Sequence, residues 1–270
     1  MDNLLSKIFE IMPELPEVYT MTKGLKTLIG QKIKNVWADK PKILDVIKKA
    51  EGRKILNVER KGKNIILGLN GEISILLHPK MTGRFLLNKR DKYERVIFYF
   101  NNGDFLTFSD KRRFGSIILD KKLAIEKLVN YIGPDVLSIN SEDFKNSLIF
   151  KKAKIKPVLM DQSIVAGIGN IYADEILWKA KIHPERLANS ISQKEFKNIF
   201  VAMNEILKKS IKLRGVSIQD YRDIFGKMGE YQNHRLVYSR TGEKCLRCSG
   251  KIKRIKISQR SAHFCPNCQK

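Results

Sequence analysis

The chain has 270 residues, 43% of them hydrophobic, which is enough for one large domain or two modest ones in an ordinary globular protein. Its 52 Lys and Arg against 28 Asp and Glu give a net charge of +24, more than solubility alone requires, so we expect a polyanionic partner; a compositional bias toward Lys and Ile is the alternative. No apolar run reaches about 18 residues, which argues against a transmembrane helix.

Residues 1–11 precede the first predicted element. They lack the basic start and the uninterrupted apolar core of a secretory signal, so we expect a cytoplasmic protein. All four cysteines fall within the last 26 residues, which indicates one local site rather than a disulfide framework.

A helix is predicted from Pro16 to about Gly30. Pro16 suits a first helical turn, and Gly30 is a natural stop. Backbone N–H groups at a helix start favour anionic ligands, so Pro13, Glu14 and Glu17 lie at an end suited to such a ligand. The apolar residues at helical spacing are Val18, Met21, Leu25 and Leu28.

Short apolar runs separated by turn residues extend from about residue 32 to residue 119 and predict a β-sandwich or barrel. Two hairpins are expected, one around Asn70-Gly71 and one around Asn102-Gly103. The segments between strands that are basic or otherwise unusual are RKGK (60–63), HPKMTG (78–83) and DKRRFG (110–115).

The pattern becomes helical near Gly133-Pro134. Ser192 and Glu195 form a capping box at the start of a helix with an apolar stripe. An earlier helix pair brackets residues 166–170, where two glycines allow backbone donors to approach a phosphate; tight helix packing is the alternative. Residues 216–232 are predicted to be a loop. The run Lys151, Lys152, Lys154 and Lys156 is typical of a solvated face, although the proline after Lys156 restricts its backbone.

The tail carries the strongest motif. Two Cys-x2-Cys pairs are separated by 16 residues, a spacing typical of a structural zinc site. Eight basic residues and one acidic residue from Thr241 onward indicate a nucleic-acid clamp. Arg260 lies near the expected hairpin tip, either as a solvated turn residue or as a contact to substrate. The four predicted ligands are Cys245, Cys248, Cys265 and Cys268.

Two further groups are ambiguous from the residues alone. Arg112 and Phe114 are suited to insertion into a base stack, but a surface arginine and a core phenylalanine are the simpler interpretation. Met81 has the same ambiguity. As a free N-terminal amine Pro13 would be a nucleophile with Glu14 as proton carrier, yet the residues alone favour prolines that only shape the helix entry.

Eight segments change this balance together: PELPEV, RKGKNIIL, HPKMTGRF, DKRRFG, IKPVLMDQ, GIGNIYADEILW, HPER and QRSAHFCPNCQK. In this order, from Met12 to Lys270, they closely resemble the bacterial formamidopyrimidine-DNA glycosylase family. The resemblance implies a bifunctional DNA glycosylase and AP lyase of base excision repair that removes 8-oxoguanine and formamidopyrimidines. It implies an iminium (Schiff base) at an N-terminal proline followed by β,δ-elimination.

The resemblance also assigns catalytic positions. Pro13 matches the nucleophile that attacks C1′, Glu14 the acid/base, and Glu17 a supporting carboxylate. Lys63 matches the lysine of β-elimination, and Arg260 matches the zinc-finger arginine that grips phosphate and assists δ-elimination. This chemistry requires a free proline amine, so we expect initiation at Met12 and removal of that methionine.

The DNA contacts implied by the resemblance come from both halves of the chain. Met81, Arg112 and Phe114 match the triad that fills the gap left by the flipped nucleotide, with Arg112 facing the orphan cytosine. Residues 216–232 resemble the loop that covers the everted base. The DNA-binding candidates are Met81, Tyr93, Arg112, Phe114, Lys151, Lys156 and Asn170, with Tyr93 standing where a histidine is common in the family.

The implied fold is α+β. It comprises an N-terminal extension (1–11), a β-sandwich catalytic domain with an N-terminal helix (12–135), a helical helix–two-turns–helix domain (136–236) and a zinc-finger β-hairpin (237–270). We expect a monomer, associated with the bacterial nucleoid through double-stranded DNA containing oxidised bases, with one structural Zn²⁺ ion. The alternatives are an endonuclease VIII-like glycosylase for oxidised pyrimidines, whose relatives usually begin PEGPE, and a non-catalytic zinc DNA-binding protein if residues 1–11 are retained.

Overall fold

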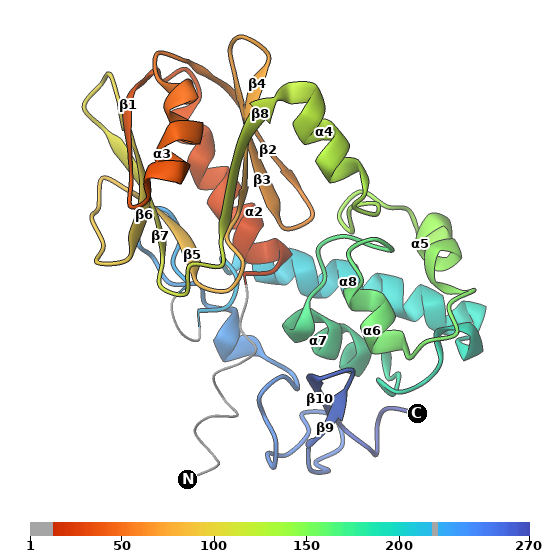
Figure 1. The fold of residues 1–270 in the computed structure, drawn as a ribbon. Helices are drawn as coiled ribbons and strands as arrows, with labels where there is room; N and C mark the ends of the chain where they lie inside the picture. The colour runs from red at the N-terminus through yellow and green to blue at the C-terminus, as the bar shows by residue number, and fades with distance from the viewer. Residues whose placement is uncertain (1–12, 218–220) are drawn as a thin grey trace. The chain divides into compact units, whose positions relative to one another are not determined.

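The computed structural model describes residues 13–217 and 221–270 (Figure 1). They divide into two compact units, one built from residues 13–131 with 213–217 and 221–230, the other from 132–212 with 231–270. No helix in these described ranges has the length and hydropathy needed to cross a membrane. The predictions for residues 1–11 and for Met12 lie outside the described residues.

The first unit is a sandwich of two four-stranded antiparallel sheets, with strand orders β1-β6-β7-β5 and β2-β3-β4-β8. One buried cluster contains apolar residues of both sheets, so the predicted β-sandwich is confirmed. The strands are β1 (Ile33–Ala38), β2 (Ile55–Lys61), β3 (Asn64–Leu69), β4 (Ile73–His78), β5 (Gly83–Leu87), β6 (Glu94–Phe100), β7 (Phe105–Asp110) and β8 (Ser116–Lys121).

Both predicted hairpins are present. β3 pairs with β4 around Gly71, and β6 pairs with β7 around Gly103. Both glycines have positive φ angles, 79° and 92°, which a residue with a Cβ adopts only at a cost. The alternation of buried and half-buried residues along β3 turns one face of the strand to the core.

Helices accompany this sandwich. The predicted N-terminal helix is confirmed as α2 (Leu15–Leu25), continued by the 3-10 turn η1 (Lys26–Leu28), and it packs against β2 and β3. Two helices were not predicted from the sequence, α3 (Pro41–Ile47, followed by η2, Lys48–Ala50) and α4 (Lys122–Asn130). They bury few side chains, one in α3 and two in α4.

The second unit is helical and ends in a two-stranded hairpin. Its longest helix starts at the predicted capping box, where the Glu195 carboxylate accepts the Ser192 N–H at 2.8 Å. The apolar stripe of that helix is buried as predicted, apart from the half-buried Phe200. The elements are α5 (Ser141–Leu148), α6 (Ile155–Met160), α7 (Asn170–Ala180), η3 (Ala188–Ser190), α8 (Gln193–Lys212), η4 (Tyr231–His234), β9 (Lys253–Ile257) and β10 (Arg260–Phe264).

A buried carboxylate on α7 ties the segment after η4 to the helices. Glu175 is fully buried, and its oxygens accept the backbone N–H groups of residues 236–238 at 2.8–3.1 Å and the Tyr231 hydroxyl at 3.1 Å. Burial raises the pKa of Glu175, while these hydrogen bonds oppose the rise. The side chain of Glu175 therefore fixes the segment that leads to the C-terminal hairpin.

Replacing this carboxylate should destabilise the second unit strongly. We expect Glu175→Ala to cost about 3 kcal/mol, because three backbone donors and a hydroxyl lose their acceptor in a buried site. The measurement is urea unfolding followed by circular dichroism. Glu205→Gln, which removes a half-exposed ion pair with Lys179, is the control and should change little. Equal unfolding midpoints for Glu175→Ala and the parent would contradict this role of Glu175.

Candidate functional site

The start of α2 is organised by a reciprocal capping box. Glu14 is the N-cap, its carboxylate accepts the backbone N–H of Glu17, and Glu17 Oε2 accepts the N–H of Glu14 at 2.9 Å. Pro13, Glu14 and Glu17 are all buried. The positive end of the helix dipole stabilises negative charge here, so the helix start holds two carboxylates beside a proline.

The second oxygen of Glu17 reaches the segment 213–230. Glu17 Oε1 accepts the N–H of Val216 at 2.7 Å, and the Tyr221 hydroxyl donates to the Glu17 carbonyl at 3.4 Å. Gly215 makes this approach possible, because a Cβ at that position would lie 2.4 Å from Oε1. Glu17 thus connects the backbone of Glu14 to the segment predicted to cover an everted base. Residues 218–220 of that segment lie outside the described residues.

Lys63 lies in the turn between β2 and β3 and is 7% exposed. The charges of Lys80 and Lys63 act on His78, at the end of β4, whose pKa is lowered to about 4 first by burial and then by these two lysines. His78 Nδ1 accepts the Lys80 N–H at 3.0 Å, so the neutral ring carries its proton on Nε2 and can donate it. The sequence singles out segment 78–83 but does not identify His78, because burial and neighbouring charge are not visible in it.

The titration of His78 tests this environment. We expect an NMR midpoint near pH 4, and because the folded pKa lies below the ordinary value of 6.5, the fold loses stability as pH falls from about 6.5 toward 4. In Lys80→Met the midpoint should rise but stay below 6.5, since burial is the larger cause. Lys48→Met, which removes a charge that does not contribute to the shift, should leave it unchanged. A midpoint near 6.5 in the parent would refute the buried neutral ring.

Met81, Arg112 and Phe114 come together in the structure. Arg112 Nη1 lies 3.2 Å from Met81 Sδ, and the Arg112 guanidinium carbon lies 4.8 Å from the centre of the Phe114 ring. Phe114 is 55% exposed, so it does not belong to the core. An exposed aromatic ring beside an arginine and a methionine suits insertion between bases.

A buried aspartate holds the two loops that carry this trio. Asp110 accepts the Thr82 hydroxyl, the Gly115 N–H at 2.6 Å and the Arg112 N–H at 3.2 Å. Thr82 in turn accepts the Arg112 N–H at 3.0 Å. These hydrogen bonds join segments 78–83 and 110–115, so they fix the backbone of the loops that carry Met81, Arg112 and Phe114.

A second carboxylate anchors the same region. Asp39 Oδ2 lies 2.9 Å from Arg113 Nη1 and 3.0 Å from Arg95 Nε, where β6 is bulged against β7. Arg113 has a left-handed backbone, with φ of 58°. Tyr93 lies alongside, because its carbonyl accepts the Asp110 N–H at 2.9 Å and Lys111 stands 5.9 Å from its ring centre.

In the second unit, Asn170 opens α7 and is 5% exposed. Gln162 shapes the turn before it, accepting the Gly167 N–H at 2.9 Å and donating to the Ile168 carbonyl at 2.8 Å. Gly167 has φ of 120°, which favours glycine. Lys151 is exposed ahead of α6, available to an anion.

Lys156 differs from its neighbours in the lysine run. It is 1% exposed, its Nζ lies 2.7 Å from Asp174 Oδ1, and it donates to the Ser261 carbonyl. Asp174 Oδ2 accepts the His263 N–H at 2.8 Å and lies 2.9 Å from His263 Nδ1. The ammonium group therefore joins α6, α7 and β10 inside this unit rather than facing solvent, a position that the lysine-rich pattern could not reveal.

Removing this buried cation should lower the free energy of unfolding. We expect Lys156→Met to destabilise the protein by about 3–5 kcal/mol, because it leaves Asp174 buried without a counter-charge. Urea unfolding measures the loss. The double variant Lys156→Met/Asp174→Asn should recover part of it, and Lys154→Met, which breaks an exposed pair with Glu185, should change little. A loss for Lys156→Met no larger than for Lys154→Met would contradict the assignment.

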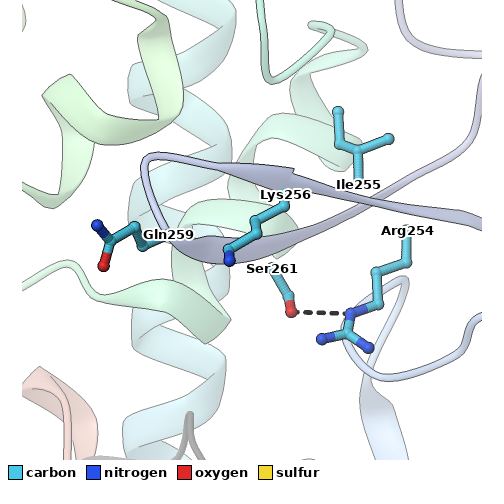
Figure 2. A pocket seen from close by; sticks show the side chains of 5 residues that line it. All are labelled: Arg254, Ile255, Lys256, Gln259 and Ser261. Atoms are coloured by element: carbon cyan, nitrogen blue, oxygen red, sulfur yellow. Dashed lines mark hydrogen bonds between the residues drawn. The ribbon is translucent and has the colours of Figure 1, made fainter. Parts of the chain in front are cut away.

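Arg260 begins β10 directly after the turn residues Ser258 and Gln259, at the predicted hairpin tip. The register pairs Arg260 with Ile257 and Ser261 with Lys256, so Arg260 faces away from the Ser261 side. A hollow of about 340 Å³ lies beside this hairpin. Arg254 Nε donates to Ser261 Oγ at 2.8 Å, and Figure 2 shows this hydrogen bond among the lining residues. The cations of the hollow suit an anionic ligand. It is lined by Arg254, Ile255, Lys256, Gln259 and Ser261.

The four cysteines converge as predicted. Their sulfur atoms all lie within 4.8 Å of one another, with Cys245 and Cys268 at 3.9 Å and Cys248 and Cys265 at 3.4 Å. Zn–S bonds of about 2.3 Å in a tetrahedron place sulfur pairs about 3.8 Å apart. The cluster fits one structural zinc ion, and four thiolates leave no position open for catalysis.

Three family models match successive parts of the chain. The model of the formamidopyrimidine-DNA glycosylase N-terminal domain matches residues 12–117, and that of the formamidopyrimidine-DNA glycosylase H2TH domain matches residues 132–222. The model of the zinc finger found in FPG and IleRS matches residues 242–270. The matched ranges contain every site residue considered above.

Full-length relatives and solved structures match as well. Formamidopyrimidine-DNA glycosylases of Herpetosiphon aurantiacus and Listeria monocytogenes are 40% and 38% identical, over 96% of this chain and 100% of each relative. The fold is similar to the Lactococcus lactis enzyme in complex with DNA containing an abasic site (TM-score 0.88, 36% identity) and with DNA containing an oxidised pyrimidine (TM-score 0.86, 35% identity). Both comparisons cover 96% of this chain and 100% of the other.

Proposed function

The chain belongs to the formamidopyrimidine-DNA glycosylase family, and we propose that it removes oxidised purines from DNA and cleaves the resulting abasic site with Pro13 as its nucleophile. The proposed substrates are 8-oxoguanine and formamidopyrimidines in double-stranded DNA. The observation that carries the proposal is the start of α2, where the capping box holds Glu14 and Glu17 beside Pro13.

The first bond changes are assigned to Pro13 and Glu14. The secondary amine attacks C1′, a C–N bond forms, and the glycosidic bond breaks as Glu14 protonates the leaving base, which takes the electron pair. Glu14 then takes the N–H proton of the proline adduct and delivers it to O4′, so the sugar opens and an iminium joins Pro13 to C1′. An α-amine with a pKa of about 8 is far more often unprotonated at neutral pH than a lysine with a pKa of about 10.4.

Two eliminations cleave the strand, and water then hydrolyses the iminium and frees the amine of Pro13. Loss of the C2′ proton expels the 3′ phosphate, and a second proton loss expels the 5′ phosphate. Lys63 is assigned to proton transfer in the first step, and Arg260 to phosphate binding and the second step. The burial of Lys63 beside His78 and the position of Arg260 at the hairpin tip support these roles. His78 is a further candidate, as a neutral donor to phosphate.

C1′ of a stacked nucleotide is out of reach, so the nucleotide has to be extruded from the duplex. Met81, Arg112 and Phe114 are assigned to filling the gap, with Arg112 facing the orphan base and Tyr93 beside them. Asn170 and Lys151 are assigned to phosphate contacts. For Lys156 we favour a positioning role, because its charge is used by Asp174 next to Ser261.

The remaining assignments concern organisation and location. We propose a monomer in the bacterial cytoplasm, associated with the nucleoid through DNA, with domains at residues 12–135, 136–236 and 237–270. Zinc would be held by the four cysteines and would supply folding energy to the hairpin that carries Arg260. The nucleophile requires a free amine at Pro13, which intact-mass measurement on protein from its native cell can test.

Borohydride trapping tests the chemistry directly. Protein beginning at Pro13 should form a covalent complex with an 8-oxoguanine:cytosine duplex, because borohydride reduces the iminium to a stable amine. Peptide mapping should place the adduct on Pro13. Glu14→Gln should lower base release by at least about 100-fold, since proton transfer is lost. Tyr19→Phe, at a position of α2 that is 38% exposed, is the control and should trap normally. No adduct with the Pro13 form would overturn the proposal.

An oxidised-pyrimidine preference is the second candidate, favoured by the oxidised-pyrimidine complex of the Lactococcus lactis enzyme. A panel of duplexes with 8-oxoguanine, formamidopyrimidine and oxidised pyrimidines separates the two. We expect the highest kcat/KM on the purine lesions. A higher kcat/KM on the pyrimidines would reverse the assignment while leaving the proline chemistry in place.

A further inference from the structure

The indole of Trp178 reaches a sulfur of the zinc site. Trp178 lies near the end of α7 and is 6% exposed, and its Nε1 is 3.4 Å from Cys245 Sγ. An indole N–H can only donate, so a buried tryptophan needs an acceptor, and here the acceptor is a zinc ligand. The same sulfur accepts the backbone N–H of Arg247 at 3.5 Å.

The guanidinium group of Arg247 packs against the indole ring of Trp178. Its guanidinium carbon lies 4.1 Å from the Trp178 ring centre. It also donates to the carbonyls of Trp178 at 3.1 Å and Lys179 at 3.3 Å. These carbonyls belong to the last turn of α7, and that of Trp178 also accepts the Lys181 N–H at 3.1 Å. Arg247 stands between two zinc ligands in sequence, so the cysteine loop and the helix end share one side chain.

The charge of the site explains why such donors matter. Four thiolates around Zn²⁺ carry a net charge of about −2. Cys245 and Cys265 are buried, so water stabilises this charge poorly on that side. An N–H donor and a guanidinium nearby stabilise a thiolate and oppose its release as a thiol. Partners of metal ligands typically change metal affinity by about 10–100-fold.

We propose that Trp178 and Arg247 form an outer shell that retains the zinc ion, with the indole N–H keeping Cys245 in place as a metal-bound thiolate. The zinc site then includes the end of α7, the helix that Asn170 begins. The inference depends on the four-cysteine zinc site and not on the lesion chemistry.

Trp178→Phe in the zinc-loaded full-length protein is the test, because it removes the N–H and keeps an aromatic ring for Arg247. Zinc release to excess 4-(2-pyridylazo)resorcinol, followed by absorbance, should be about tenfold faster than in the parent. Trp37→Phe, which alters the other tryptophan, 41% exposed on β1, is the matched control and should release zinc at the parent rate. Equal release from Trp178→Phe and the parent overturns the proposal.

A site-resolved measurement separates this role from general destabilisation of the hairpin. Brief treatment with N-ethylmaleimide and peptide mass spectrometry gives an alkylation rate for each cysteine. In the parent the exposed Cys248 should react before the buried Cys245, and in Trp178→Phe the rate should rise most at Cys245. A uniform rise at all four cysteines would refute a specific contact.

Arg247 provides a second variant if Trp178→Phe folds poorly. Arg247→Met should accelerate zinc release severalfold, and Arg247→Lys, which restores the charge without the planar fork, should recover part of the loss. Parent-like release from Arg247→Met would remove Arg247 from the proposal. Neither measurement reads lesion excision, so failure here leaves the proposed function untouched, and failure of borohydride trapping leaves this inference untouched.

Discussion

The carboxylate of Glu17 joins two parts of the chain that are 199 residues apart, the start of α2 and the segment that begins at Gly215. One oxygen fixes the backbone of Glu14, and the other fixes Val216. The position of the proposed acid/base therefore depends on the same side chain that binds the backbone of Val216. Glycine at 215 follows from this, since any Cβ would displace the carboxylate.

In the second unit, carboxylates on α7 likewise join distant parts of the chain. A helix buried on nearly all sides would ordinarily be apolar, yet α7 carries Asp174 and Glu175 in its buried interior. Each is paired with other elements, Asp174 through an ion pair with α6 and a hydrogen bond from β10, and Glu175 through hydrogen bonds from residues 231–238. Buried polar groups are costly unless satisfied, so they permit only one arrangement of the hairpin on the helices.

Local sequence patterns predicted the features that depend on residues close together in the chain. The spacing of Val18, Met21 and Leu25 gave α2, the Asn-Gly turns gave both hairpins, and the Cys-x2-Cys pairs gave the zinc cluster. Contacts between distant residues could not be predicted this way. The pairing of Asp39 with Arg113, the neutral state of His78 and the burial of Lys156 depend on neighbours that only the fold brings close. The lysine run at 151–156 shows most clearly that residue type alone does not predict burial, because Lys151 is exposed and Lys156 is buried.

The excess of basic residues is a property of the whole chain, unlike these local contacts. An internal ion pair uses one cation and one anion, so pairing inside the fold cannot reduce the net charge of +24. Even if every acidic residue were paired, 24 cations would keep no acidic partner, and their mutual repulsion opposes the compact state. A phosphate backbone relieves that repulsion by replacing condensed counterions with Lys and Arg, which makes affinity depend steeply on salt. Affinity for DNA therefore comes from a charge that no single side chain controls, whereas Glu17 and the carboxylates on α7 each fix the position of a few neighbouring groups.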